Sequence, residues 1–408
     1  MMNRFYTREF FALARARLAR DGLLVFRMSA SESYFSETRR AYLGCVVKAL
    51  RESFPNVLAT YGGSTFILAS PSKDVFTADG AELARRYAAR GVRSENFTPL
   101  LFEGATETLD ADKLAFIRRQ IEQGERDATV NADGLPRAAL LHVALWDEIT
   151  SGREGSAFAL LVRATTPWTL AVAVALTVAW FALARFGLRR RRVESAMLYS
   201  VATTGLATMA VELVLLAAFQ SLCGFVYTWI GVIVGAFMLG LVIGSRAMKR
   251  LLRWRPALGP RTLAGLDLLL AWFALVALII LLHATLSDAP PDAVAVVVLA
   301  LIVLSGVLGG AIFPLAASVL VGGHPCVAPV AVQQQKEGGP MGPPLQDTAA
   351  TGRAAASVTA ADNIGACLGA LVAGVLLVPA LGIAGTCLVL MLLKLISAAA
   401  LFLAARRT

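Results

Sequence analysis

The chain has 408 residues, a formal net charge of +10 and 57% hydrophobic residues. This length leaves room for two domains, and much of the positive charge lies in short loops beside apolar segments, which argues against nucleic-acid binding. The five cysteines form no C-x-x-C pair and the three histidines are scattered, so a disulfide framework or a zinc site is not expected.

Residues 1–156 carry charges throughout and predict a soluble domain. Thr7 is expected to cap a helix that runs to about Arg20. A buried strand, a second helix and a hairpin around two glycines should follow, at Leu23–Met28, Ser36–Ser53, and Val57–Tyr61 with Thr65–Ala69. This order fits the last third of an α/β sheet domain, but three strands and two helices do not complete one.

Residues 83–150 are predicted to be mostly helical, with residues 111–125 the clearest case. The polar stretch 130–136 should form a turn before a helix over residues 138–149. The aspartates of this half, Asp21, Asp74, Asp79 and Asp110, are interpreted as turn or cap residues rather than catalytic groups.

Residues 157–408 hold seven apolar runs, each long enough to cross a bilayer as a helix. They are Pro167–Phe186, Ala196–Leu222, Gly224–Ser245, Leu263–Leu286, Ala293–Val321, Val358–Leu381 and Ala384–Ala405. The fold class expected from the whole chain is therefore a helical membrane bundle of about seven spans, preceded by a partial α/β domain.

Small and helix-breaking residues punctuate these runs. Pairs of glycines four positions apart should let helices approach closely; they are Gly231 with Gly235, Gly240 with Gly244, and Gly365 with Gly369. Pro314 should kink the fifth run. The Pro-, Gly- and Gln-rich segment 322–352 is predicted to be a flexible surface loop.

Lysines and arginines in short loops predict the orientation. The basic segments 189–192, 246–261 and 406–407 should be cytoplasmic, and the acidic loop 287–292 should lie outside. One crossing before residue 189 would then place residues 1–156 outside, although Met1–Phe11 shows no signal peptide. Three explanations stay open: the charge rule fails there, the first run does not cross, or an upstream segment sets the topology.

Four ionisable residues lie within the apolar runs: Glu212, Asp267, Asp362 and Lys394. A charged group at a helix centre costs ~2.5–3.5 kcal/mol on insertion scales. Asp267 and Asp362 lie near predicted cytoplasmic ends, so a small cost is expected for them. Glu212 and Lys394 lie deeper, and we expect that they pair or line one polar cavity, or else that both are structural contacts inside the bundle.

Several segments resemble membrane-bound, fused spermidine-synthase-like proteins. In the soluble half the resembling segments are 3–11, 22–26, 61–70 and the pattern Asn131-x-Asp133 before Pro136. In the membrane half they are 205–212, 237–241, 313–316 and 360–369. Two departures are Thr359, where that family tends to have tyrosine, and a long 322–352 loop.

This resemblance implies a class I methyltransferase-like sheet and an aminopropyl transfer from decarboxylated S-adenosylmethionine to putrescine. No G-x-G-x-x-G occurs in residues 1–160, and the family's glycine-rich loop and catalytic aspartate lie upstream of the helix that begins near Tyr6. No catalytic, cofactor-binding or metal-binding residue is therefore assigned, and the chain is expected to be inactive alone.

Two other functions remain open. The bundle could transport polyamines or another small solute, with Glu212 and Lys394 on its pathway, although no inverted repeat is clear in the sequence. The chain could instead be a membrane scaffold for a separate catalytic subunit. The expected partners are the lipid bilayer, a second copy or an upstream catalytic segment, without nucleic acid, and the expected location is a bacterial inner membrane.

Overall fold

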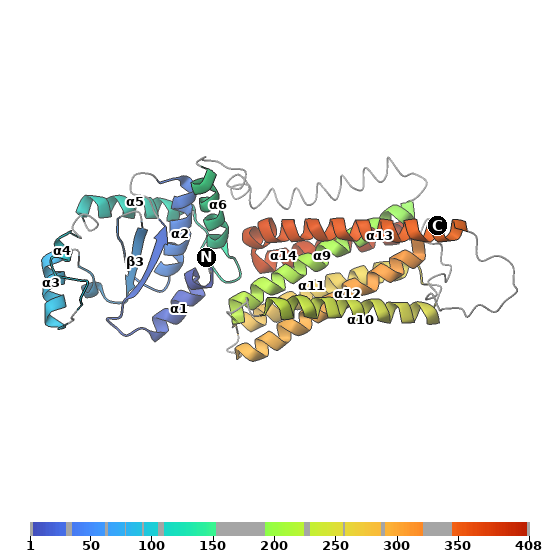
Figure 1. The fold of residues 1–408 in the computed structure, drawn as a ribbon, viewed down its shortest axis with the longest axis horizontal. Helices are drawn as coiled ribbons and strands as arrows, with labels where there is room; N and C mark the ends of the chain where they lie inside the picture. The colour runs from blue at the N-terminus through green and yellow to red at the C-terminus, as the bar shows by residue number, and fades with distance from the viewer. Residues whose placement is uncertain are drawn as a thin grey trace. The chain divides into compact units, whose positions relative to one another are not determined.

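The computed structural model describes residues 3–29, 35–61, 64–77, 79–91, 94–104, 110–151, 192–223, 229–255, 258–286, 290–320 and 345–405. The chain divides into two compact units, Met1–Ala164 and Thr165–Thr408, which we call the soluble unit and the membrane unit (Figure 1). The predicted boundary at residues 156–157 lies outside the described residues.

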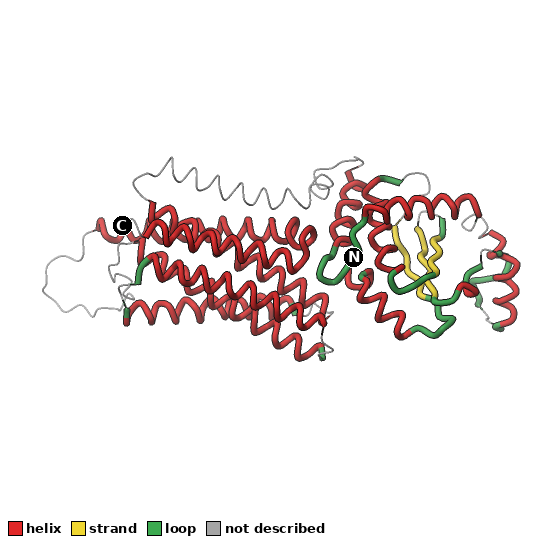
Figure 2. The backbone as a smooth tube through the Cα atoms, turned by 180° about the vertical axis from the view of Figure 1, so that it is seen from behind, coloured by secondary structure: helices red, strands yellow, loops and turns green. Residues whose placement is uncertain are grey.

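The soluble unit combines helices with one small sheet. Its elements are η1 (Asn3–Tyr6), α1 (Arg8–Arg17), β1 (Leu24–Ser29), α2 (Glu37–Arg51), β2 (Asn56–Ala59), β3 (Ser64–Ser70), η2 (Lys73–Val75), α3 (Gly80–Ala89), α4 (Leu101–Gly104), α5 (Ala111–Asp127) and α6 (Arg137–Ser151). The strands form an antiparallel sheet in the order β1-β3-β2, drawn in yellow in Figure 2.

Local signals in the sequence place these elements well. Thr7, Ser36, Asp79 and Asp110 accept hydrogen bonds from the first turns of α1, α2, α3 and α5, as N-caps do. This confirms the predicted cap role of Asp79 and Asp110, and the predicted hairpin is confirmed by β2 and β3. α1 ends at Arg17 rather than near Arg20, because Leu18 already has extended backbone angles.

Helix α2 forms the centre of the soluble core. Its buried apolar residues face the sheet residues Met28, Ile67 and Ala69 in one cluster. On its other side α2 meets α5 through two glycines, where a Cβ on Gly44 would lie 2.3 Å from the carbonyl carbon of Gly124. Three antiparallel strands do not reveal a methyltransferase-like sheet, so that assignment stays a prediction.

The membrane unit is helical throughout its described residues (Figure 2). Its elements are α9 (Arg192–Cys223), α10 (Ile230–Trp254), α11 (Pro260–Leu286), α12 (Pro291–Leu320), α13 (Leu345–Val372), the π-helical segment η4 (Ala373–Leu377) and α14 (Val378–Ala405). Five stretches are long and apolar enough to cross a bilayer: Val193–Cys223, Ile230–Trp254, Pro260–Ala284, Asp292–Leu320 and Gly352–Ala405. The protein is therefore an integral membrane protein of the helical type.

The last of these stretches contains two passes. A straight helix of its 54 residues would be roughly 80 Å long, far more than the ~30 Å hydrocarbon layer. Gly382, with φ of 72°, breaks the helix, and the chain then returns along the bundle. Six of the seven predicted runs thus lie in helices. The run 167–186 lies outside the described residues, so the count of seven stays a prediction.

Contacts fix the direction of every helix in the membrane unit. Met197 near the start of α9, Met248 near the end of α10 and Leu263 near the start of α11 pack in one cluster. Leu315 near the end of α12, Val358 of α13 and Leu401 near the end of α14 join them at that end. Successive helices therefore run in opposite directions, as expected for a chain that crosses repeatedly.

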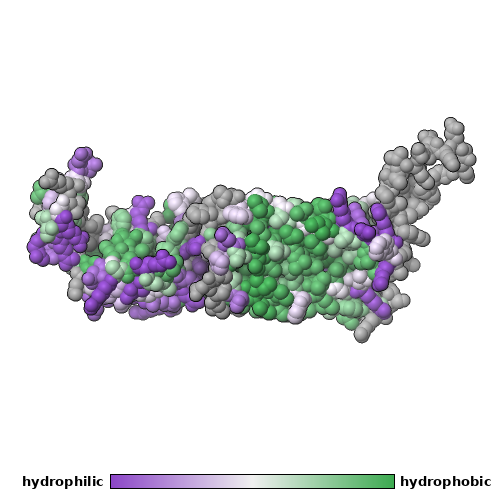
Figure 3. All heavy atoms as spheres, turned by 90° about the horizontal axis from the view of Figure 1, so that it is seen from below, coloured by the Kyte–Doolittle hydropathy of each residue, from purple (hydrophilic) through white to green (hydrophobic). Residues whose placement is uncertain are grey.

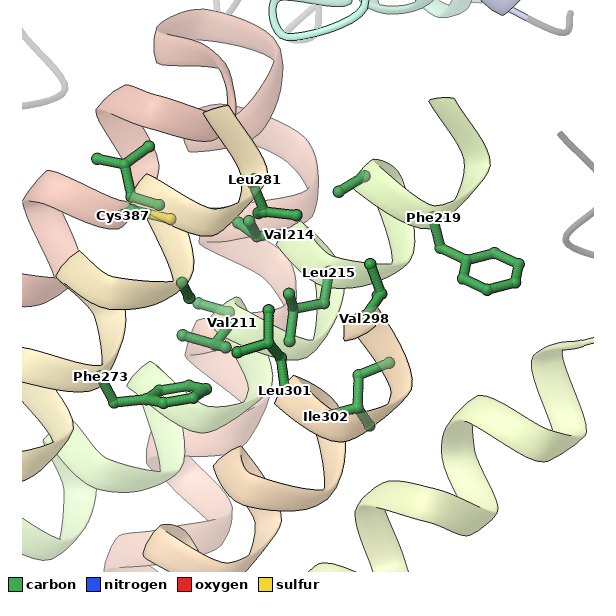
Figure 4. Close-up of a cluster of buried hydrophobic side chains, with 14 of the residues drawn as sticks. Val211, Val214, Leu215, Phe219, Phe273, Leu281, Val298, Leu301, Ile302 and Cys387 are labelled. Carbon is green, nitrogen blue, oxygen red and sulfur yellow. The ribbon is translucent and has the colours of Figure 1, made fainter. Parts of the chain in front are cut away.

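A second cluster fills the rest of the bundle (Figure 4). Figure 4 shows Val211 and Leu215 from α9, Phe273 from α11 and Leu301 from α12 turned toward one another. The face in Figure 3 has a broad hydrophobic area with hydrophilic side chains at one end. On α10, Arg246, Lys249, Arg250 and Arg253 are exposed.

One prediction about the linking segment was partly wrong. The proposed loop 322–352 extends too far, because α13 already begins at Leu345. The sequence Ala349-Ala350 and Ala354-Ala355-Ala356 explains the helix, since alanine has the highest helix propensity. Residues 321–344 lie outside the described part of the chain.

Candidate functional site: a buried ion pair in the membrane unit

The most unusual chemistry of the membrane unit is a lysine and an aspartate with no access to solvent. Asp267 of α11 and Lys394 of α14 are 0% and 1% exposed, and their Oδ1 and Nζ atoms are 2.5 Å apart. Two buried charges lose their hydration, so they persist only with close pairing and further hydrogen bonds. This pair has both.

Hydroxyl groups surround the ion pair. Lys394 Nζ lies 2.9 Å from Thr204 Oγ1, 3.3 Å from Thr203 Oγ1 and 3.4 Å from the Ser200 carbonyl oxygen, all on α9. We call the six residues Ser200, Thr203, Thr204, Asp267, Lys394 and Ser397 the polar cluster. All six are buried.

The other carboxylate oxygen is also held. Ser200 and Ser397 donate hydrogen bonds to Asp267 Oδ2, at 2.9 and 2.5 Å, and the Thr203 hydroxyl lies 3.3 Å from that of Ser397. Asp267 Oδ2 therefore faces two donors while Oδ1 faces the ammonium group. The orientation of the carboxylate is fixed by three helices.

Of the alternatives left open for Glu212 and Lys394, a pair between these two residues is wrong. Lys394 pairs with Asp267 instead, because α14 runs antiparallel to α9 and sets Lys394 beside Ser200 and Thr204, two turns before Glu212. The expected small burial cost of Asp267 is also wrong. It is the eighth residue of α11, but α9 and α14 cover it completely.

The other two intramembrane acids stand apart from the cluster. Glu212 is 9% exposed on α9, and Asp362 of α13 packs against Gly205, where a side chain would meet the Asp362 carbonyl and carboxylate oxygens. Among the described residues, neither acid has a hydrogen bond or an ion pair. Of the four predicted site residues, the structure thus unites only Asp267 and Lys394.

Sequence reasoning missed the hydroxyl residues. Ser200, Thr203 and Thr204 share one face of α9, since positions three and four apart are neighbours on a helix. A run of three hydroxyl residues in an apolar span was the available signal. It was ambiguous because serine and threonine can bond back to their own helix, as Thr204 does to the Ser200 carbonyl oxygen at 2.7 Å.

The soluble unit has a polar centre of a different kind. Asn131 donates to Asn3 Oδ1 and the Tyr6 carbonyl oxygen, at 3.1 and 2.8 Å, and accepts from the Ala138 amide at 2.9 Å. Nearby, burial raises the pKa of Asp133 to about 6. Asn131 thus joins the amino-terminal segment to α6, which is a structural role.

The buried cysteine of the soluble unit does not have the environment of a reactive thiol. Burial raises the pKa of the Cys45 thiol to about 12, so the reactive thiolate is not formed at neutral pH. Within the described ranges, no three His, Cys, Asp or Glu side chains group as a metal site.

Two helix pairs of the membrane unit meet backbone to backbone at glycines. On α9 and α13, a Cβ at Gly365 would lie 1.9 Å from the Ala202 carbonyl oxygen, and one at Gly369 would lie 2.4 Å from that of Leu206. On α12 and α10, a Cβ at Gly240 would lie 2.3 Å from the Val303 oxygen, and one at Gly244 would lie 2.0 Å from that of Val307. Both pairs are parallel and tightly packed.

The two pairs match residue for residue. A shift of 101 positions relates Ala202 to Val303, Gly205 to Gly306 and Leu206 to Val307. A shift of 125 positions relates Asp362, Gly365 and Gly369 of α13 to Phe237, Gly240 and Gly244 of α10. The contact of Gly205 with Asp362 is then equivalent to that of Gly306 with Phe237. The same contact pattern therefore occurs twice.

A contact between counterparts supports this match. Thr208 of α9 corresponds to Gly309 of α12 by the same shift, and the two touch, with Thr208 Cγ2 2.8 Å from a Cβ placed on Gly309. Because α9 and α12 run in opposite directions, this contact lies on a pseudo-two-fold axis in the membrane plane. α9 and α10 thus match α12 and α13 in inverted orientation, and α11 and α14 follow them in the same order in the two repeats.

The polar cluster breaks this symmetry. The counterparts of Ser200 and Thr203 in the second repeat are Leu301 and Leu304, and only Thr204 has a polar counterpart, the buried Ser305. In the second repeat Leu301 is buried at the position of Ser200, whereas Leu304, at the position of Thr203, is exposed. The packing of the repeat alone does not account for the cluster.

No protein-family model, curated protein or solved structure matches the chain. The resemblance to spermidine-synthase-like proteins accordingly stays a prediction. The function must be argued from the geometry of the two units.

Proposed function

We propose that the protein is a multi-pass protein of the bacterial inner membrane whose membrane unit transports a small solute, with the polar cluster on or beside the pathway. The inverted repeat is the observation that carries this proposal. Secondary transporters are often built from such repeats and bind their substrates where the repeats meet. The cluster joins α9 and α11 of one repeat to α14 of the other.

Two further features favour transport over a purely structural bundle. Intramembrane charged pairs that face the bundle interior mark ion and substrate pathways in many membrane proteins. The second repeat is also interrupted, by η4 at Ala373–Leu377 and by the break at Gly382. Segments of π-helix occur frequently at functional sites.

A flux measurement tests this function. The purified chain, reconstituted in proteoliposomes, should take up radiolabelled putrescine or spermidine with saturation. Asp267→Asn should reduce the initial rate at least about tenfold, since a buried lysine left without its counter-ion is strongly disfavoured. Lys249→Met, at an exposed lysine of α10, is the matched control. If neither the wild type nor this control shows saturable uptake, the proposal is refuted.

The second candidate is a spermidine-synthase-like protein, with a seventh span at 167–186 and a methyltransferase-like soluble domain. What supports it is that the resembling segments pack together. The Asp133 amide donates to Glu9 at 3.0 Å, and Ser70 donates to the Gly22 carbonyl oxygen at 2.9 Å. On this reading the soluble unit docks a separate catalytic subunit.

A ligand-binding measurement tests whether the chain, on this second candidate function, is inactive alone or is an active enzyme. Isothermal titration of the full chain with decarboxylated S-adenosylmethionine should give no measurable heat, because the chain has no G-x-G-x-x-G loop in residues 1–160. Saturable micromolar binding would contradict the expected lack of activity. Binding that appears only after a nucleotide-binding protein is added would favour the docking role.

A further inference from the structure

The polar cluster has the composition of a binding site for a primary ammonium group. A protonated lysine has three N–H donors and no acceptor. Around Lys394 Nζ the structure places four oxygen acceptors, from Asp267, Thr203, Thr204 and the Ser200 carbonyl. Together they supply one negative charge and more acceptors than the three donors require.

The acceptors are organised by contacts that do not involve the lysine. Ser200 and Ser397 hold Asp267 Oδ2, while Thr203 and Thr204 donate to the Ser200 carbonyl oxygen at 3.0 and 2.7 Å. If the ammonium group were removed, these oxygen acceptors would keep their positions. Such preorganisation lowers the cost of binding a replacement.

Packing does not explain why the pair is there. A buried ion pair is often no more stabilising than apolar residues of similar volume, and the second repeat packs with the buried Leu301 at the position equivalent to Ser200. Asp267 is the charged group that contacts Lys394. The structure gives neither Glu212 nor Asp362 a hydrogen bond or ion pair to it.

We propose that Ser200, Thr203, Thr204 and Asp267 form a primary-ammonium site, which Lys394 occupies in the absence of solute and yields to a small alkylammonium solute. This inference rests on the proposed transport function and names its substrate class. When the solute ammonium binds Asp267, Lys394 gives up one proton to water and stays as the neutral amine. One ammonium then enters for each proton released, and the net charge of the buried site is unchanged.

Removing the internal cation tests the site without any need for transport. Lys394→Ala leaves space for the ammonium group and stem of n-butylammonium, so this salt should raise the thermal unfolding temperature of the detergent-solubilised variant with saturation. Tetramethylammonium has the same charge but no N–H donor and should have no such effect. In Asp267→Asn/Lys394→Ala, n-butylammonium should bind at least about tenfold more weakly, since the carboxylate is gone.

The wild type provides a measurement if Lys394→Ala does not fold. Radiolabelled n-butylammonium should bind the wild type saturably, and an indicator dye in weak buffer should record one proton released per ammonium bound. Asp267→Asn should abolish both signals, and Lys249→Ala should leave both unchanged. Absence of saturable butylammonium binding to both Lys394→Ala and the wild type overturns the site. Binding without flux in proteoliposomes would instead reject transport and keep the site.

Discussion

At the scale of single residues, the Asp267–Lys394 pair decides how the membrane unit tolerates charge changes. Lys394→Met and Asp267→Leu each leave a buried group without its partner, and each should lower the free energy of unfolding by about 3–5 kcal/mol. The double substitution Asp267→Leu/Lys394→Met should cost far less than the sum. Denaturant unfolding in one detergent measures all three.

The exposed Lys249→Met serves as the control for losing a lysine. Strictly additive losses in the double variant would show that the two side chains are not coupled. Coupling is expected because the contact is short and both groups are buried.

Asp133 should make the soluble unit lose stability as pH rises. Its pKa is raised by burial from 3.8 to about 6 in the folded chain, so between about pH 4 and 6 the folded state binds more protons than the unfolded state. The free energy of unfolding therefore falls across this window and stays lower above it. Asp133→Asn should remove the fall and stabilise the unit by up to about 3 kcal/mol at pH 7.5.

Tryptophan fluorescence of the full chain, followed during thermal unfolding at pH 4 and pH 7.5, checks this expectation. Asp21→Asn, at an exposed turn, is the matched control. A variant that is equally stabilised at both pH values would show that the change acts through packing rather than through the proton.

Some residue roles could be read from the sequence and others could not. Asp79 and Asp110 were predictable caps because a cap depends on the next few residues alone. The partner of Lys394 was not, because it depends on the relative rotation and offset of α11 and α14. The hydropathy pattern placed four ionisable groups within membrane spans, but it does not specify which of these groups contact each other.

At the scale of elements, the glycine contacts between helices give the sharpest test of the repeat. Gly240→Leu and Gly365→Leu introduce side chains where a Cβ alone would overlap a backbone oxygen. Because the two glycines are counterparts, both variants should lose stability by a similar amount, about 2–3 kcal/mol or more by overpacking. Thermal unfolding in detergent measures the loss.

Gly231→Leu is the matched control on the same helix, since no atom lies within 4 Å of a Cβ placed there. It should be nearly neutral. If Gly231→Leu were as harmful as Gly240→Leu, the effect would come from glycine chemistry in the helix and not from the contact with α12.

The sequence predicted close packing at Gly240, Gly244, Gly365 and Gly369, and this is confirmed. It also predicted the same for Gly231 and Gly235, where no atom of the described residues lies within 4 Å of an added Cβ. The inverted repeat was not predicted from the sequence, because its helix contacts require only small residues at a few positions. The remaining positions of α9 and α12 are free to differ, as Ser200 and Leu301 do.

At the scale of the whole molecule, the alternating helix directions predict the sides of the loops. A cysteine at Arg253, near the end of α10, and one at Asp292, in the first turn of α12, should lie on opposite sides of the membrane. In a cysteine-free chain, an impermeant maleimide added to sealed vesicles should label only one of them. The loop arginines predict that Arg253 is cytoplasmic.

Lysis of the vesicles before labelling is the control, since both sites should then react. Labelling of both sites in sealed vesicles would contradict the antiparallel order of α10, α11 and α12. The sequence was sufficient for this level of organisation because apolar runs and loop charges are properties of single segments.

The inverted repeat has a consequence for how the chain chooses its topology during insertion. Because a repeat crosses the membrane three times, its two ends lie on opposite sides of the bilayer. A second copy joined directly to it therefore has the inverted orientation. Yet the end of α10 carries Arg246, Lys249, Arg250 and Arg253, while the matching stretch of α13 and η4, Leu371–Val378, has no charged residue. If both stretches were equally basic, the positive charges that set orientation would be balanced between the two sides of the membrane. The chain would then have no preferred orientation.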